Sequence, residues 1–133
     1  YSPQDGLVAT PFTSLEGLLA KNTDVDPFNA PKKLQEQIKA KLYGDYTGGM
    51  NTVPVNFLSN VDTTGGNSGS PTLNGKAELV GLLFDGVYES IIGDWDYNPE
   101  LNRSIHVDSR YMLWVMDKVD NAQNLLDEMT IVK

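Results

Sequence analysis

One serine of this chain stands in a setting that suits nucleophilic chemistry. Ser68 lies in the stretch 64–71, which reads TGGNSGSP. Attack of a serine hydroxyl on a carbonyl carbon creates an oxyanion, and backbone N–H groups fixed at that point stabilise the charge. The N–H groups of Gly66 and Ser68 are the predicted donors, because the glycines around them let the backbone curl tightly and approach a substrate. Pro71 then fixes the backbone at the exit from the loop.

The same residue types also form plain surface turns. A turn selected for composition alone seldom has this order, and a regular hairpin follows it, with the two-residue turn signal Asn74-Gly75. The order of residues resembles the nucleophile loop of chymotrypsin-like serine peptidases. We therefore predict that Ser68 is a catalytic nucleophile rather than a residue of a simple turn.

A serine nucleophile needs a histidine base, which a carboxylate orients in turn. The chain contains a single histidine, His106. Around it, Ile105 and Val107 alternate with polar residues in the pattern of a half-buried strand. His106 follows the serine, whereas the base of chymotrypsin-like enzymes precedes it by a long way. We interpret His106 as a polar-face histidine, and expect that the base was lost or lies on sequence outside this chain.

Composition excludes several functional classes. The 18 acidic and 10 basic residues give a net charge of −8, which disfavours nucleic acid as a partner. This charge suits a cationic group such as a peptide N-terminus, and equally a merely solvated surface. The absence of cysteine excludes a disulfide scaffold and a thiolate metal site. No apolar run approaches the about 18 residues of a membrane span.

Length and the first residues indicate a piece of a larger protein. The 133 residues are enough for one domain with its own core. The opening Tyr1–Gly6 has neither Met nor an apolar leader and reads as the middle of a loop.

Two patterns suggest other sites. The stretch 94–98, DWDYN, begins like a calcium loop, but Pro99 and Ile105 stand where that loop needs Gly and Glu. We expect a polar turn there, and no metal or other cofactor. The lysines of 32–41 are interleaved with Glu36 and Gln37, which predicts a solvated helix face.

The periodicity divides the chain into a helical and loop lead-in (1–52), strands that carry the nucleophile loop (53–107) and closing helices (108–133). A capping box at 13–16 predicts a helix over about 13–21, and Pro31 predicts the start of a second helix that ends before Gly44. The expected inward side chains of these helices are Leu15, Leu18, Leu19, Leu34, Ile38 and Leu42. Strands are predicted at 53–59, 71–73, 77–84 and 103–107.

The closing segment reads as two helices. Residues 111–119 are apolar on nearly every side, which predicts a buried helix. Asn121 is the predicted cap of a last helix, with Leu125, Leu126 and Met129 facing inward.

Longer strings resemble the bacterial dipeptidyl-peptidase 7/11 family. They are TTGGNSGSP (63–71), NGK (74–76), ELVGL (78–82), FDG (84–86), PEL (99–101), RSI (103–105), VDSRY (107–111), MDK (116–118) and LDEM (126–129). The similarity covers essentially the whole chain. Members of that family are exopeptidases, several times longer, that remove dipeptides from free peptide N-termini.

The resemblance implies a fold that is mainly β with peripheral helices: half of a chymotrypsin-like double β-barrel, the second barrel, plus C-terminal helices. The family's triad His and Asp belong to the N-terminal part. This chain would then supply the nucleophile Ser68 and the oxyanion N–H of Gly66, and the isolated chain is expected to be inactive.

Two further positions match family residues. Asp85 matches an aspartate near the substrate's α-amino group, and a fixed carboxylate beside the nucleophile would anchor an ammonium. Gly86 matches the position that shapes the S1 pocket, where glycine resembles members that accept apolar P1 residues and arginine marks the acidic-P1 type. From the residues alone, Asp85 as a turn former and Gly86 as a glycine with positive φ remain open.

The resemblance also implies partners and a location. The partners are peptides with a free N-terminus, the absent N-terminal part of the same polypeptide, and a second copy in a homodimer of the full-length protein. The expected location is the periplasm or the cell surface. A non-catalytic peptide-binding or interaction module on a degenerate peptidase barrel is the alternative. A lipase-like hydrolase is disfavoured, because Pro71 and a hairpin follow the serine instead of a helix.

Overall fold

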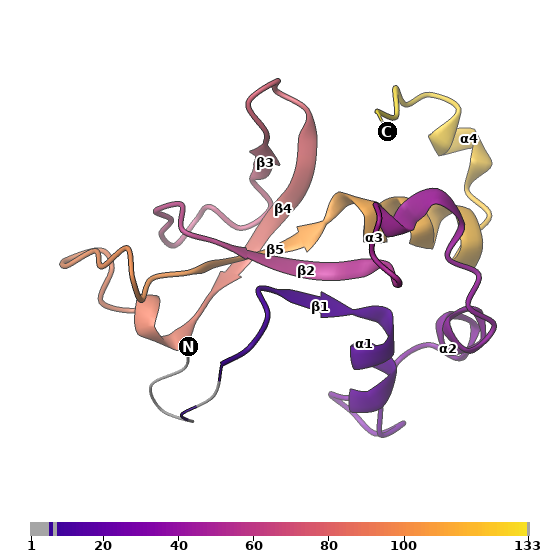
Figure 1. Cartoon of the computed structure of the whole chain (residues 1–133), viewed down its shortest axis with the longest axis horizontal. Helices are drawn as coiled ribbons and strands as arrows, with labels where there is room; N and C mark the ends of the chain where they lie inside the picture. Colours follow the sequence, from indigo (N-terminus) through magenta and orange to yellow (C-terminus); the bar gives the residue numbers. More distant parts are fainter. Residues whose placement is uncertain (1–5, 7, 133) are drawn as a thin grey trace.

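The computed structural model describes residues 6 and 8–132, so most of the predicted loop at 1–6 lies outside the described residues. Its strands form one antiparallel sheet of five strands in the order β1-β2-β5-β4-β3 (Figure 1). The strands are β1 (Phe12–Ser14), β2 (Pro54–Ser59), β3 (Pro71–Leu73), β4 (Leu79–Gly86) and β5 (Ser104–Asp108). The last strand in the sequence is therefore the central strand of the sheet.

Helices gather at one end of the sheet, while the β3–β4 hairpin and the loop between β4 and β5 extend away from them (Figure 1). The helices are α1 (Leu15–Lys21), α2 (Lys32–Lys39), α3 (Ser109–Trp114), which continues as the π-helical turn η3 (Val115–Val119), and α4 (Gln123–Leu126). Short 3-10 turns are η1 (Gly44–Thr47) and η2 (Tyr88–Ser90). Within the described residues, no helix is long and apolar enough to cross a membrane.

The apolar core lies between the helices and the start of β2. Trp114 is fully buried at its centre, and its indole N–H donates to the carbonyl oxygen of Leu42 at 2.8 Å. The other buried members are Leu15, Leu34, Ile38, Val53, Val55 and Val119. Burial of these side chains, at about 1.5–3 kcal/mol each, therefore holds the helices against the beginning of β2 rather than against the nucleophile segment.

The first helix begins later than the capping box predicts. Phe12–Ser14 pairs with β2 as strand β1, so the helix cannot start before Leu15. Ser14 is the N-cap, and its hydroxyl accepts from the Gly17 N–H at 3.1 Å. The predicted partner Glu16 instead accepts hydrogen bonds from the hydroxyls of Tyr43 and Thr52.

Several predicted inward side chains are exposed. α2 ends at Lys39, so Leu42 falls outside the helix and is 50% exposed. In the C-terminal segment, Leu126 is buried, but Leu125 and Met129 are each 45% exposed. The N-cap of α4 is Ala122 rather than Asn121. The helix predicted at 111–119 starts at 109, and its side chains are mostly half-buried.

The β3–β4 hairpin forms where predicted, with a longer turn. The Asn74 N–H donates to Glu78 O at 3.0 Å, and the Ala77 N–H donates to Asn74 O at 3.0 Å. Ala77, not Gly75, has a positive φ of 62°. The turn therefore exceeds two residues and delays β4 to Leu79.

β5 alternates as predicted, with its two faces exchanged. Ser104, His106 and Asp108 are buried, whereas Ile105 and Val107 are half-buried. The face of the sheet that points into the molecule is thus polar along its central strand, and each of these polar groups needs a partner there.

Candidate functional site

The predicted nucleophile loop extends the ladder between β3 and β4. The Leu83 N–H donates to Ser70 O at 3.0 Å, and the Gly69 N–H donates back to Leu83 O at 2.7 Å. These two bonds attach the residue after Ser68 to β4, two positions before Asp85. A short and rigid connection therefore links the predicted nucleophile to the predicted ammonium anchor.

Internal hydrogen bonds fix the shape of the loop. The Thr64 N–H donates to the side-chain oxygen of Asn67 at 2.9 Å, and the Asn67 N–H donates to Thr64 O at 3.2 Å. The Ser70 N–H donates to Asn67 O at 2.9 Å. Gly66 and Gly69 have φ of 95° and 86°, in the left-handed region that favours glycine. The sequence order around Ser68 is thus explained by backbone geometry.

The predicted oxyanion donors remain available. Among the described residues, the N–H groups of Gly66 and Ser68 donate to no acceptor. Ser68 is exposed, and a Cβ placed at Gly65, Gly66 or Gly69 would meet nothing within 4 Å. The surface of the loop is therefore uncovered at its glycines, which is compatible with the predicted approach of a substrate.

Asp85 and Gly86 end strand β4. The pairing of β4 with β5 is irregular between Leu83 and Asp85, and Gly86 is the partner of Ser104. Asp85 is exposed, and its Oδ1 accepts from the Gly86 N–H at 2.8 Å. Asp85 is a strand residue, so its interpretation as a turn former is wrong.

The alternative for Gly86 is also wrong, because its φ lies outside the left-handed region. A Cβ at this position would contact Arg103 O and Ser90 Cβ at 3.7 Å, which is ordinary van der Waals distance. The backbone there accepts a Cβ without a clash. Glycine is thus not needed for the conformation, and its effect is to leave space beside Ser90.

His106 is held in the interior of the molecule. It is 1% exposed, Nε2 bonds to Ser59 Oγ at 2.6 Å and Nδ1 bonds to Thr72 Oγ1 at 2.7 Å. Its ring stacks on Phe57 with centroids 4.8 Å apart, and burial lowers the pKa of His106. With both nitrogens engaged, the imidazole has no free position for the Ser68 hydroxyl. The prediction of a polar-face histidine is wrong in one respect, since that face is buried.

Other polar groups, buried or half-buried, anchor the segment that leads to the loop. Ser104 Oγ bonds to Thr63 Oγ1 at 2.6 Å and donates to Val61 O at 3.0 Å. The Tyr97 hydroxyl donates to Asn60 O at 2.5 Å. The loop is therefore held by β5 and by the β4–β5 connection. Sequence reasoning missed these contacts, because they join residues about 40 positions apart.

Asp108 combines two structural roles. Its carboxylate accepts from the Arg110 N–H as the N-cap of α3, and it receives the Arg110 guanidinium through Nε at 2.9 Å and Nη2 at 2.8 Å. The hydrogen bond to Asp108 raises the pKa of Arg110. Asp108 is thus a paired structural carboxylate and not a candidate to orient His106.

Within residues 6 and 8–132, no group of three or more His, Asp or Glu side chains is arranged to hold a metal ion. The stretch 94–98, which begins like a calcium loop, starts in a turn where the N–H groups of Trp95 and Asp96 both donate to Ile92 O. A small pocket of about 220 Å³ lies beside the nucleophile loop and is lined by Asp62, Thr63, Thr64, Asn67, Gly93 and Asp94.

Comparison with known proteins gives a consistent result. The family described as Peptidase S46 matches residues 1–131. An Asp/Glu-specific dipeptidyl-peptidase of Shewanella putrefaciens is 48% identical over all of this chain and 21% of its own length. Dipeptidyl-peptidase 7 of Phocaeicola vulgatus is 44% identical over all of this chain and 19% of its own length.

A solved structure agrees with these sequences. The crystal structure of Porphyromonas endodontalis DPP11 in complex with the dipeptide Arg-Asp superposes with a TM-score of 0.91 at 40% identity, over 96% of this chain and 19% of that protein. The chain therefore spans about one fifth of the length of these relatives.

Proposed function

Because this chain belongs to the peptidase S46 family, we propose that it is the nucleophile-bearing C-terminal portion of a serine exopeptidase that removes dipeptides from free peptide N-termini. In this proposal the five-stranded sheet is the second half of a chymotrypsin-like double β-barrel. The observation that carries the proposal is the loop at Ser68, which is exposed, attached to β4 and flanked by two free N–H donors.

The reaction divides between this chain and the rest of the protein. The Ser68 hydroxyl attacks the carbonyl carbon of the second residue and passes its proton to a histidine on sequence outside this chain. The N–H groups of Gly66 and Ser68 stabilise the resulting oxyanion. The C–N bond then breaks, the leaving amine takes the proton, and water hydrolyses the acyl-enzyme on Ser68. His106 takes no part, since both its nitrogens bond to other hydroxyls.

Asp85 selects the N-terminal end of the peptide, and Gly86 determines which P1 side chain fits. The exposed Asp85 carboxylate binds the α-ammonium of the substrate, which places the second carbonyl at Ser68. The absent side chain of Gly86 leaves room for an apolar P1 residue. The full-length enzyme then acts on peptides with a free N-terminus, in the periplasm or at the cell surface.

The first experiment replaces the nucleophile in the full-length protein. Ser68→Ala should lower kcat for a dipeptidyl fluorogenic substrate by roughly 10⁴-fold or more. The matched control Ser70→Ala changes another serine of the same loop and should not cause this loss of kcat. Full activity of Ser68→Ala would exclude the proposal. A wild-type protein that binds dipeptides without hydrolysing them would favour the alternative, a non-catalytic peptide-binding module.

The second experiment tests the ammonium anchor. Asp85→Asn loses a charge-assisted contact of about 1.5–3 kcal/mol, which corresponds to roughly 10- to 150-fold in kcat/KM. Acetylation of the substrate's N-terminus should cost the wild type a similar factor and the variant far less. Equal losses for both proteins on acetylation would show that Asp85 does not bind the ammonium.

A further inference from the structure

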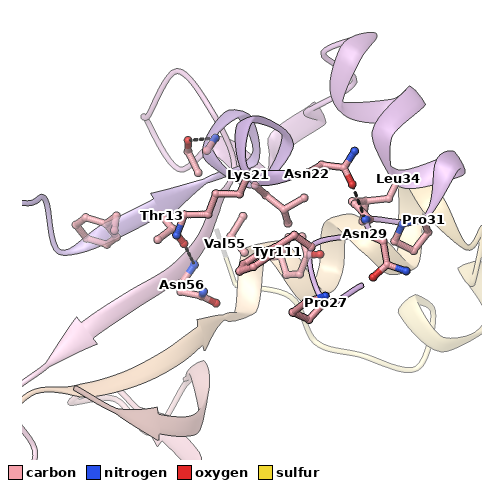
Figure 2. A pocket seen from close by; sticks show the side chains of 16 residues that line it. Thr13, Lys21, Asn22, Pro27, Asn29, Pro31, Leu34, Val55, Asn56 and Tyr111 are labelled. Carbon is pink, nitrogen blue, oxygen red and sulfur yellow. Dashed lines mark hydrogen bonds between the residues drawn. The ribbon is translucent and has the colours of Figure 1, made fainter. Parts of the chain in front are cut away.

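A large groove lies away from the nucleophile loop. Its volume is about 640 Å³, and none of its lining residues comes from the segment between β2 and β5. Figure 2 shows Val55 and Tyr111 between Thr13 and Asn56 on one side and the Pro27–Pro31 segment on the other. α1 and the start of α2 complete the walls.

Hydrogen bonds hold the walls of this groove in place. The Asn22 side-chain oxygen accepts from the Ala30 N–H at 2.7 Å, and Gln35 Nε2 donates to Ala30 O at 2.8 Å. On the opposite wall, the Asn56 N–H donates to Thr13 Oγ1 at 3.1 Å. The groove is therefore a formed feature of the fold and not a gap between loose loops.

The lining combines apolar surface with unused polar groups. Phe12 and Phe28 are 41% and 57% exposed. Among the described residues, the Tyr111 hydroxyl and the side-chain amides of Asn29 and Asn56 make no hydrogen bond. Burial raises the pKa of Tyr111, so its hydroxyl stays a donor. An extended peptide matches this surface, since it offers apolar side chains together with carbonyl and N–H groups.

We propose that this groove receives a segment of the same polypeptide from outside residues 1–133, and so joins this portion to the rest of the enzyme. This inference rests on the proposed function, in which the chain is part of a longer peptidase. About four fifths of the length of the relatives lies outside the matched region, since this chain covers 21% and 19% of them. That sequence is present at high effective concentration wherever the groove is present.

Thiol labelling of the full-length protein tests whether the groove is covered. Phe12→Cys and Phe28→Cys should react with a maleimide at least about 100-fold more slowly in the native than in the denatured protein. Leu125→Cys is the control matched for exposure, because Leu125 is 45% exposed against 41% for Phe12. Lys76→Cys gives the labelling rate of a cysteine in the exposed β3–β4 turn. Groove cysteines that label as fast as Lys76→Cys would overturn the proposal.

Cross-linking identifies the occupant. A benzophenone amino acid replaces Lys21, whose side chain lies at the groove and is exposed, so the substitution leaves the core intact. After irradiation, mass spectrometry should find links to peptides of the same polypeptide outside residues 1–133. The proposal would be overturned by links only within 1–133, or by links between two copies of the protein that no longer form when the protein is diluted before irradiation.

Neither measurement depends on catalysis. If Ser68→Ala kept full activity, the peptidase proposal would fail, while protection and cross-linking at the groove would still decide the docking proposal. The reverse also holds, because an open groove leaves the Ser68 result unaffected.

Discussion

Replacement of His106 separates the structural from the catalytic interpretation of the chain's one histidine. The imidazole is 1% exposed, and its two nitrogens hydrogen-bond to the hydroxyls of Ser59 and Thr72. Truncation of a buried ring to Ala costs about 3–5 kcal/mol through lost packing and a cavity. Each of the two half-buried hydroxyls loses a partner at about 1 kcal/mol. His106→Ala should therefore destabilise the protein by about 5–7 kcal/mol.

A loss of that size approaches the total stability of many domains, so a milder variant is needed as well. His106→Gln keeps a side chain that donates and accepts, and should cost less than His106→Ala. Thr72→Val is the matched control, because it removes one of the two bonds and leaves the ring in place. The midpoints of thermal inactivation of the full-length protein should rank Thr72→Val and His106→Gln above His106→Ala.

Kinetics of the same variants decide the functional question. For His106→Gln, kcat/KM per folded enzyme should stay within about threefold of the wild type, because both ring nitrogens bond to the hydroxyls of Ser59 and Thr72 rather than to Ser68. A general base contributes far more than this factor. A drop of about a thousandfold at unchanged thermal stability would refute the argument and make His106 the base.

The pH dependence has a definite sign. Burial lowers the pKa of His106 in the folded protein below the value of about 6.5 in an unfolded chain. In the window below 6.5, the unfolded chain binds more protons, so the stability from neutral His106 is present above pH 6.5 and lost as the pH falls through the folded pKa. The inactivation midpoint of His106→Gln should fall less between pH 7 and 5 than that of the wild type. An identical slope would contradict the assignment of this loss to His106.

Two further predictions concern Asp108 and Gly86 in the full-length protein. Asp108→Ala removes an N-cap and leaves Arg110 unpaired, which should lower the free energy of unfolding by about 2–4 kcal/mol. Asp108→Asn keeps the cap and should cost less. Thermal inactivation midpoints equal to that of the wild type for both variants would contradict this prediction. Gly86→Arg meets only contacts at 3.7 Å at its Cβ and should shift preference from apolar toward acidic P1 residues by roughly 10- to 150-fold, the equivalent of a charge-assisted bond of about 1.5–3 kcal/mol. Gly86→Met is the uncharged control, and an unchanged ratio of kcat/KM for the two substrates would exclude Gly86 from the S1 pocket.

The sequence predicted the strands that have a clear period, and it missed those that depend on pairing. β2, β3 and β5 lie within one or two residues of their predicted bounds. β1 has three residues and directly precedes a helix, so no periodicity can indicate it. Its pairing with β2 then moved the start of α1, which illustrates how tertiary contacts override a local capping signal.

The exchanged faces of β5 have a physical cause that periodicity cannot contain. Alternation fixes which residues share a face, but hydrophobicity alone says that the apolar face is the inner one. Here the polar face is inside because each of its groups has a partner. Asp108 pairs with the nearby Arg110, but the partners of the other two are far away in sequence: Thr63 for Ser104, and Ser59 and Thr72 for His106. Three such pairings must form together, which no single window of sequence shows.

The nucleophile loop could be predicted for the opposite reason, since its geometry is local. Gly66 and Gly69 supply positive φ, and Asn67 closes the turn onto Thr64, so the requirement is written in consecutive residues. What the loop contacts is not local: β4 and β5 hold it through Leu83 and Ser104. Both strands also position Asp85 and Gly86. Damage to the polar interior at His106 therefore lowers the stability of the sheet but leaves the chemistry of the folded site in place, whereas damage at Ser68 removes the chemistry and leaves the sheet unchanged. This asymmetry separates stability from chemistry in the variants above.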